Sequence, residues 1–409
     1  MVTKCGCIRT LGDWSCALCG FLRKSKWLAS LFLSVSFIAP RPVFAEPGVF
    51  DDKILFGQSA AFKGPAAALG NGMRDGILAA FNEINELGGV QGRWLELLAY
   101  NDGYEPRTAI ANTKRLINED EVFALIGEVG TPTSKAVQPI AGSENVPFLG
   151  AFTGASFLRD PALTNVINVR ASYDQETESW IEHLTRDLGL SRIAILYQDD
   201  SFGRAGLSGV RAAMARRGME LVAEGTYKRN TVAVKRALLA LRKGDPEAVV
   251  IVGAYKPSAR FIKLARSIGV DAVFVNISFV GSKALSEELG PDGAGVIVSQ
   301  VVPLPDDTSV QLVTSYLSAL AALDPEIEPG FVSLEGYMVG RLVIEALKEM
   351  GRDVNRAGLI ETIKSVGTFD LGGISLSYGQ HDNQGMDRVF LTVIQADGSF
   401  EAVEKPTRN

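Results

Sequence analysis

Reactive side chains are scarce in this sequence of 409 residues. From residue 46 onward there is no cysteine, which excludes disulfides and thiol chemistry from that part of the chain. The four cysteines all precede it, at Cys5, Cys7, Cys16 and Cys19. A C-x-C followed by a C-x-x-C is compatible with a metal site. We instead expect residues 1–22 to be a discarded leader or to follow a misplaced start codon, and we predict no metal site.

Motifs of catalysis are absent as well. The chain has only two histidines, and it lacks the G-x-S-x-G, G-x-x-x-x-G-K-[ST] and H-E-x-x-H patterns. The stretch "GNGMRDG" has the wrong spacing for a dinucleotide-binding fingerprint. An exported hydrolase would need a nucleophile beside a base, and the sequence offers no such pair. We therefore predict that the protein is not an enzyme and needs no cofactor.

Positive charge is sparse beyond the N-terminus. Without residues 1–45 the chain holds 35 basic and 46 acidic residues, which gives a net charge of −11. The longest runs of basic residues there are pairs, such as Arg216-Arg217. Binding to nucleic acid depends on a basic surface. The sequence therefore predicts no nucleic-acid partner.

Only one apolar run stands out, and it is short. It extends over about 13 residues from Trp27 to Ala39, whereas a membrane-spanning helix needs roughly 20. The basic residues of "RKSK" precede it, and Val43-Phe44-Ala45 follows it. This order is typical of a secretory signal peptide. We predict cleavage near Ala45 and an exported, soluble chain from Glu46 onward; an uncleaved anchor helix is the alternative.

From Glu46 the pattern alternates between short β-branched runs and helical periodicity, which favours βα units and a mostly parallel sheet. In the first series the strand "KILFGQSA" precedes a helix whose apolar face recurs every three or four residues from Met73 to Leu87. A second series starts near Arg170. Its expected helices are Glu176–Leu188, Arg204–Arg217, Val232–Arg242 and Pro257–Ile268. Two series of this kind predict an α/β protein with two doubly wound parallel-sheet lobes.

The remainder, from about Val302, is too small for a third domain. It contains expected helices at Ser309–Leu323 and Phe331–Met350, then the end pieces "GISLSYG" and "RVFLTVIQADGSF". We expect these segments to complete both lobes, so that the chain crosses between the lobes more than once.

The residues at the carboxyl ends of the expected strands are hydroxyls, glycines and aromatics. Ligands of open α/β sheets bind at this edge. The first candidates there are Ser59, Thr131, Thr133, Ser134, Thr153, Tyr255, Ser278 and Phe279. Thr131 is placed as an N-cap with Pro132 as first helical residue. It either forms an anion seat with the helix N-terminus or only caps its helix.

Two aspartates near these strand ends are also ambiguous. Asp102 is expected to cap the helix that begins near Pro106. Asp174 either caps the helix after Arg170 or holds a ligand ammonium group. Phe202 and Tyr255 either pack over a ligand or belong to the rim of the core.

In the segment from Gly64 to Pro106, a G-P turn is followed by the helix end "INELGGVQG" and the strand exit "NDGYEP". This order resembles the periplasmic solute-binding proteins of ABC importers, of the branched-chain amino acid-binding (Leu/Ile/Val-binding) type. The stretches "ALIGEVGTPTSKAV", "VPFLGAF", "NVRASYDQETES", "RIAILYQDDSFGRAG" and "VVIVGAYKPSARFIKLARSIG" continue the resemblance in order. It covers essentially all of the chain after the leader.

The resemblance implies a type I periplasmic binding protein, with two lobes, three crossovers and a ligand in the cleft. We expect residues 1–45 to be leader and signal peptide, 46–172 plus 304–387 to form lobe 1, and 173–303 plus 388–409 to form lobe 2. The implied function is the extracytoplasmic solute-binding subunit of an ABC importer in the periplasm. Its implied partners are a small-molecule ligand and a membrane permease, and it is expected to be a monomer. A soluble sensor that reports to a membrane receptor is the alternative.

The resemblance also assigns the cleft residues. Thr131, Thr133 and Ser134 match the loop that holds a ligand carboxylate, Thr153 and Ala155 match a second such loop, and Asp174, Phe202 and Tyr255 match cleft residues of the second lobe. Phe202 departs from the tyrosine of amino-acid binders. Ser278 stands where leucine-type binders tend to have a glutamate that pairs with the ligand ammonium. An aromatic or aliphatic acid, or an amide, is therefore as compatible with this site as an amino acid.

Overall fold

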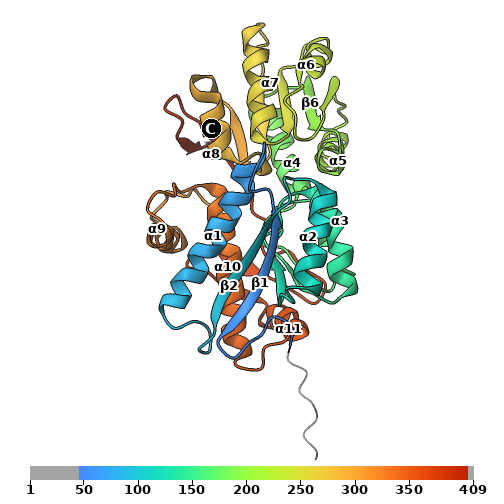
Figure 1. Cartoon of the computed structure of the whole chain (residues 1–409). Coiled ribbons are helices and arrows are strands. Elements are labelled where there is room, and N and C mark those ends of the chain that lie inside the picture. Colours follow the sequence, from blue (N-terminus) through green and yellow to red (C-terminus); the bar gives the residue numbers. More distant parts are fainter. Residues whose placement is uncertain (1–45, 404–409) are drawn as a thin grey trace, which may run out of the picture. The chain divides into compact units, whose positions relative to one another are not determined.

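A computed structural model describes residues 46–403. The predicted signal peptide lies outside these described residues. Within them, no helix has the length and apolar character needed to cross a bilayer. Figure 1 shows two sheets, each with helices on both of its faces.

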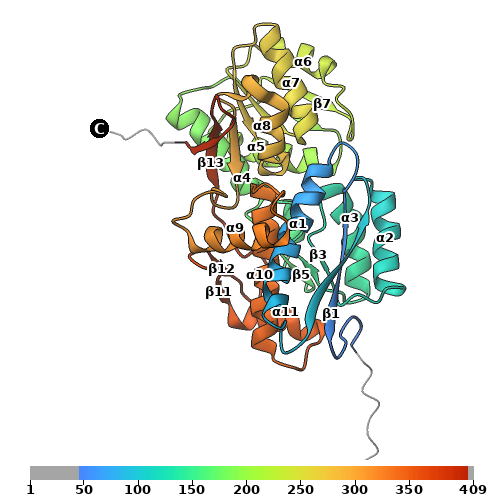
Figure 2. The ribbon, with the colours of Figure 1, turned by 60° about the vertical axis from the view of Figure 1, so that its left-hand side comes forward.

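The first sheet has five strands, and every pairing in it is parallel. The part of the chain built on it is called lobe 1 here. In spatial order the strands are β2 (Trp94–Asn101), β1 (Lys53–Ala60), β3 (Ala124–Ile126), β4 (Phe148–Leu149) and β5 (Val166–Ile167). One face is covered by α2 (Pro106–Asn118) and α3 (Thr131–Ser143), the other by α1 (Ala67–Glu86) and α10 (Phe331–Met350) (Figures 1 and 2).

The second sheet has seven strands and carries lobe 2. In spatial order these are β14 (Phe400–Ala402), β13 (Phe390–Ile394), β10 (Ile297–Gln300), β9 (Val273–Asn276), β8 (Ala248–Val252), β6 (Ile193–Gln198) and β7 (Ala223–Tyr227). Five are parallel, and β13 and β14 add an antiparallel hairpin at one edge. Its helices are α4 (Tyr173–Glu182), α5 (Ser201–Ala215), α6 (Lys235–Arg242), α7 (Tyr255–Ser267) and α8 (Ser282–Leu289).

The chain passes between the two lobes three times: between β5 and α4, between β10 and α9 (Gln311–Leu323), and between β12 (Ser375–Ser377) and β13. The segment between the second and third crossovers, which belongs to lobe 1, also contains α11 (Arg356–Val366) and β11 (Thr368–Asp370). The short helical turns are η1 (Ser156–Arg159), η2 (His183–Asp187), η3 (Ser278–Val280) and η4 (Gly290–Gly293). The predicted α/β fold with two doubly wound lobes and three crossovers is confirmed, while the exact domain boundaries stay a prediction.

Several helices begin earlier than the sequence pattern indicates. Helix α4 starts at Tyr173 instead of Glu176, because Ser172 and Gln175 form a capping box. It ends at Glu182 and continues as the π-helical turn η2. Helix α5 starts at Ser201 because the Asp200 side chain accepts a hydrogen bond from the Phe202 N–H.

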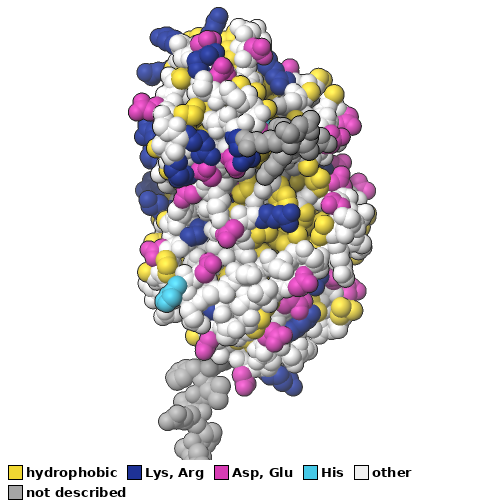
Figure 3. All heavy atoms as spheres, turned by 180° about the vertical axis from the view of Figure 1, so that it is seen from behind, with side chains coloured by type: hydrophobic (Ala, Val, Ile, Leu, Met, Phe, Trp, Pro, Cys, Tyr) yellow, Lys and Arg dark blue, Asp and Glu magenta, His cyan; other side chains and the backbone are white. Residues whose placement is uncertain are grey.

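The molecular surface in Figure 3 mixes both signs of charge. Acidic and basic side chains are interspersed on this face, with Lys and Arg more frequent over the lobe at the top. An apolar area lies at mid-height on this face. This face thus carries no continuous basic surface, in line with the acidic balance of the sequence.

Helices α1 and α10 pack closely because glycine lies at their contact. A Cβ atom added at Gly76 would stand 1.9 Å from the carbonyl oxygen of Ser333, and one at Gly336 would stand 2.4 Å from that of Met73. Such distances are far below van der Waals contact, so any side chain here forces the helices apart. This contact joins the first helix of lobe 1 to a helix that returns to it much later in the chain.

The substitution Gly76→Ala is therefore expected to lower the free energy of unfolding by on the order of 2 kcal/mol, because overpacking displaces α10. Gly142→Ala is the matched control: it also lies in a helix, and its added Cβ meets no atom closer than 3.4 Å. The control should leave stability unchanged or raise it by about 0.5 kcal/mol through helix propensity. Urea unfolding followed by circular dichroism measures both, and equal effects of the two substitutions would contradict the close packing.

Candidate functional site

The carboxyl ends of the strands of both sheets meet at a group of buried rings, called the aromatic cluster here. Its members are Tyr104 and Phe152 from lobe 1, Tyr173 at the start of α4, and Phe202 and Phe279 from lobe 2. Phe279 lies at the centre, with ring centroids 4.6 Å from Phe202, 5.3 Å from Phe152 and 5.9 Å from Tyr104. Tyr173 joins through Phe202 at 5.6 Å. The two lobes therefore contact each other through Phe279, at the edge where α/β sheets bind ligands.

Two of the predicted hydroxyls stand beside the aromatic cluster. The Oγ1 atoms of Thr131 and Thr153 are 2.7 Å apart, and Thr153 also donates to the hydroxyl of Tyr173 at 3.3 Å. The N–H of Ala155 donates to Thr153 Oγ1 at 3.3 Å. Thr131 follows β3 and Thr153 follows β4, and because these strands are parallel neighbours, their exits converge. The structure thus brings these two loops together, and their binding of a ligand carboxylate stays a prediction.

The predicted capping role of Thr131 is wrong. The N-cap of α3 is Gly130, and Thr131 and Pro132 are the first two helical residues. Gly130 has a φ of 103°, and a Cβ there would lie 2.1 Å from the ring of Tyr104. Only glycine fits this position. The hydroxyl of Thr131 is therefore not used to cap its own helix and instead reaches Thr153.

The predicted capping role of Asp102 is also wrong. Glu105 precedes α2 and makes no side-chain capping bond. The carboxylate of Asp102 instead accepts from the N–H of Tyr104 at 2.7 Å and from Ser59 Oγ at 3.0 Å. Burial raises the pKa of Asp102 to about 6. Asp102 thereby fixes the turn that directs Tyr104 toward lobe 2.

The other predicted residues divide into two groups. Thr133 donates to the carbonyl of Gly130, and Ser134 lies buried in the same turn. Tyr255 reaches the N-terminus of α1, where its hydroxyl lies 3.5 Å from the N–H of Ala68. The other two have different partners: Ser59 Oγ accepts from Asn112 of α2, and Asp174 is exposed, accepts from Ser156 Oγ and does not cap α4.

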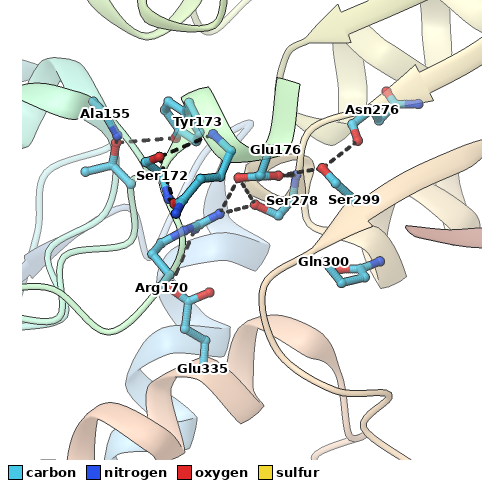
Figure 4. A network of polar contacts seen from close by, with 12 residues as sticks. Ala155, Arg170, Ser172, Tyr173, Glu176, Asn276, Ser278, Ser299, Gln300 and Glu335 are labelled. Carbon is cyan, nitrogen blue, oxygen red and sulfur yellow. Dashed lines mark hydrogen bonds and ion pairs between the residues drawn. The ribbon is translucent and has the colours of Figure 1, made fainter. Parts of the chain in front are cut away.

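Ser278 belongs to a polar network that crosses from one lobe to the other (Figure 4). Glu176 is its centre: one carboxylate oxygen accepts from Arg170 at 3.2 Å and from Ser278 Oγ at 2.8 Å. The other oxygen accepts from the N–H of Ser278 at 2.9 Å and from Ser299 Oγ. On the lobe 1 side, Arg170 Nη1 lies 3.6 Å from a carboxylate oxygen of Glu335 in α10. The network therefore ties the first crossover to both lobes.

The guanidinium of Arg170 is 1% exposed and lies 4.9 Å from the ring centroid of Phe152 and 5.8 Å from that of Tyr173. Burial alone would lower the pKa of Arg170, but Glu335 and Glu176 outweigh it and raise the pKa. Burial raises the pKa of Glu335 to about 7, although Arg170 opposes the rise. Phe279 was among the candidates at the strand ends, whereas Arg170, Glu176 and Glu335 were not among the predicted site residues. No local motif marks them, because their partners are distant in the sequence.

Polar contacts also join the lobes on the side of Tyr104. Arg229 donates to Glu105 at 2.9 Å, Asn230 donates to the carbonyl of Gly103 at 3.1 Å, and Gln198 donates to the hydroxyl of Tyr104 at 3.3 Å. Arg229 and Glu105 are partly exposed, so their ion pair contributes little stability and separates readily. The deeper contacts around Arg170 are fully buried.

Comparison with known proteins agrees with this geometry. The sequence model of the periplasmic binding protein family matches residues 53–399. The chain belongs to this family.

Three known proteins are similar to this chain over most of its length. A crystal structure of a possible leucine/isoleucine/valine-binding protein from Rhodopirellula baltica SH 1 is 39% identical, covers 87% of this chain and 97% of its own, and has a TM-score of 0.84. The Leu/Ile/Val-binding protein homolog 7 of Brucella abortus is 24% identical over 88% of this chain and 92% of its own. A fatty acid ABC transporter substrate-binding protein from Thermomonospora curvata, 20% identical over 88% of this chain and 93% of its own, shares the fold with a TM-score of 0.81.

This member of the periplasmic binding protein family also buries an unusual carboxylate next to its site. Both carboxylate oxygens of Glu128 lack a hydrogen-bond partner among residues 46–403, and the side chain is 1% exposed. Val129 pairs with Phe152 and both belong to the core that contains the aromatic cluster. The carbonyl oxygen of Glu128 accepts from the N–H of Phe152 at 2.7 Å. Burial raises the pKa of Glu128 well above its usual range.

A raised pKa in the folded chain means that folding stability falls as the pH rises above about 4.5, the ordinary pKa of a glutamate. Glu128→Gln removes this loss, so the variant is expected to be more stable than the parent at pH 8 by on the order of 2 kcal/mol and about equal at pH 4. Glu178→Gln is the matched control: its carboxylate pairs with Arg216 and Arg217, which outweigh the effect of burial and lower its pKa, so this variant should lose about 0.5 kcal/mol at pH 8. Urea unfolding at both pH values tests this; a loss of stability in Glu128→Gln at pH 8 would show that its carboxylate is ionised and bonded.

Proposed function

We propose that the protein is the extracytoplasmic solute-binding subunit of an ABC importer. It would capture an amino acid or a related small carboxylate or amide between its lobes, in the periplasm. The observation that carries this proposal is the meeting of hydroxyls and rings from the strand ends of both lobes at one buried place. The proposed lobes are residues 46–172 with 304–387 and residues 173–303 with 388–409.

The relatives support this role through what their names say of them. The Brucella protein is described as a Leu/Ile/Val-binding protein homolog, and the Thermomonospora protein as an ABC transporter substrate-binding protein for fatty acids. These names cover ligands that share a carboxylate and differ in the rest of the molecule. We carry over the capture of a small carboxylate as the proposed activity of this chain.

In the proposed mechanism, lobe 1 receives the polar end of the ligand. The hydroxyls of Thr131 and Thr153 are held 2.7 Å apart, and rotation of their O–H bonds away from their present partners would offer donors to one ligand oxygen or to two. The N-terminus of α3 adds a favourable dipole for negative charge. These groups are neutral, so they bind an anion without the desolvation of an additional buried charge.

Lobe 2 would then close over the ligand. Rotation about the three crossovers is a hinge motion of the kind that encloses ligands between domains. The closed state would be fastened by the contacts of Arg229 and Asn230 with residues 103–105. Closure would also bring the outer surfaces of both lobes into the single arrangement that a membrane permease recognises.

The hydroxyl pair gives the direct test of this function. We expect Thr131→Val and Thr153→Val each to weaken binding by about tenfold or more, because a hydrogen bond to a charged ligand group is lost. Isothermal titration calorimetry would use unfolded and refolded protein with a panel of amino acids, carboxylates and amides, and then the tightest binder of that panel.

Thr113→Val is the matched control for these substitutions. Thr113 is fully buried in α2, and its hydroxyl has no hydrogen-bond partner within the described part of the chain. This variant should bind like the parent protein. Parental affinity in both Thr131→Val and Thr153→Val would contradict the proposed site, and no binding by any compound of the panel would contradict the function.

A further inference from the structure

Two carboxylates beside the aromatic cluster, Glu176 and Asp200, have no free acceptor oxygen. Glu176 uses both oxygens, for Arg170, Ser278 and Ser299. Asp200 also uses both, one for the N–H of Phe202 and the other for Gln198 and Arg229. These groups are therefore committed to the protein itself.

The remaining acids nearby are paired, exposed or buried in surroundings that favour the neutral form. Glu335 is paired with Arg170, and Asp102 accepts from Ser59 and from the backbone of Tyr104. Glu128 is buried with no partner for either oxygen among the described residues, which raises its pKa and favours the neutral form, and Asp174 is exposed. A ligand ammonium group buried here would lack a counter-charge, and a buried unpaired charge is strongly unfavourable.

The arginine side chains at this place, in contrast, still have an N–H donor without a partner in the described chain. Arg170 is buried against Phe152 and Tyr173, and its Nε has no hydrogen-bond partner among the residues that the structure describes. Arg159 lies beneath the loop that carries Thr153, with Nη1 donating to the carbonyls of Thr153 and Ala155. Burial and the neighbouring Arg170 lower the pKa of Arg159 to about 9. An anion bound next to the two arginines would relieve their mutual repulsion.

The apolar part of the site is built from rings. Phe279 contacts Tyr104, Phe152 and Phe202 in tilted arrangements, with interplanar angles of 38°, 32° and 52°. Tilted and edge-on ring contacts are more favourable than the buried area alone accounts for. Surfaces of this kind select a ring over an aliphatic chain of similar size.

We infer that the solute is an aromatic carboxylate that carries no ammonium group. Its ring packs within the aromatic cluster against Phe279, and its carboxylate meets the hydroxyls of Thr131 and Thr153, with Arg170 supplying the positive charge. The inference rests on the proposed solute-binding function and narrows it to one chemical class. Phe279 is the residue that determines the preference for a ring.

The test uses pairs of compounds that differ in a single group. Calorimetric titration of the refolded full chain would compare 3-phenylpropanoate with L-phenylalanine, and phenylacetate with L-phenylglycine, which differ only in the ammonium group. Two further compounds are 3-phenylpropanamide, which lacks the charge, and 3-cyclohexylpropanoate, which lacks the aromatic ring. We expect at least one of the two aromatic acids to bind at least tenfold more tightly than its amino-acid counterpart, its amide or its saturated analogue.

A variant separates the ring preference from general destabilisation. Phe279→Leu keeps an apolar side chain. It should weaken the binding of the aromatic acid by about fivefold or more and keep the affinity for the saturated acid within twofold of the parent's. Thr113→Val serves as the control and should change neither. Equal losses for both acids in Phe279→Leu would overturn the role given to Phe279.

The outcomes distinguish the inference from the function on which it rests. If L-leucine or another amino acid binds and neither aromatic acid does, the solute-binding function stands and the inference is wrong. If L-phenylalanine binds as tightly as 3-phenylpropanoate, the inference is likewise wrong. If none of the aromatic acids, amino acids and amides binds, both the function and the inference fail.

Discussion

Burial of the Arg170 guanidinium between the lobes is the constraint on which the rest of the site depends. Removing a charge from water costs several kcal/mol, and the cost is offset only by well-placed opposite charges. Here one carboxylate comes from each lobe: Glu176 from α4 and Glu335 from α10. Because neither lobe supplies both partners, the ion pairs require the lobes to stand close together at the first crossover.

The polar network around Arg170 sets the position of the aromatic cluster. Glu176 holds the backbone and the hydroxyl of Ser278, and the next residue is Phe279. The ring of Phe279 is thereby directed across the gap to Tyr104 and Phe152 of lobe 1. Arg170 itself packs on Phe152, so one guanidinium is linked to both the polar and the apolar parts of the site. The three crossovers and the exposed ion pair at Glu105 permit the lobes to separate without breaking the sheets.

Much of this arrangement could be predicted from the sequence. The alternation of strands and helices indicated the two lobes, Pro106 marked the start of α2, and the predicted bounds of α10, Phe331–Met350, are those of the structure. The convergence of Thr131 and Thr153 was also predictable, since the exits of adjacent parallel strands lie at one edge of a sheet. Local pattern sufficed for these features because each depends on neighbours in the same lobe.

The features that could not be predicted from the sequence depend on tertiary geometry. Gly130 is the N-cap of α3 because the ring of Tyr104 leaves no room for a side chain at that position. Asp102 bonds Ser59 and the backbone of Tyr104 and does not cap α2. Arg170 pairs with Glu176 of lobe 2 and with Glu335 of lobe 1, and no local pattern encodes the relative position of these two carboxylates. The commitment of Glu176 to Ser278 and Ser299 belongs to the same class, and it decides which ligand charges the site accepts.

The central claim is that a solute is held between two lobes that close over it, and a distance across the gap tests it most directly. Arg107 and Lys228 are exposed and lie close in sequence to the Glu105–Arg229 pair, one in each lobe, and the chain from Glu46 onward has no other cysteine. Spin labels on Arg107→Cys and Lys228→Cys allow double electron–electron resonance with and without the tightest-binding solute. The account predicts a longer, broader distance distribution without solute that collapses to one short distance when solute is added. The same distribution in both samples would contradict it.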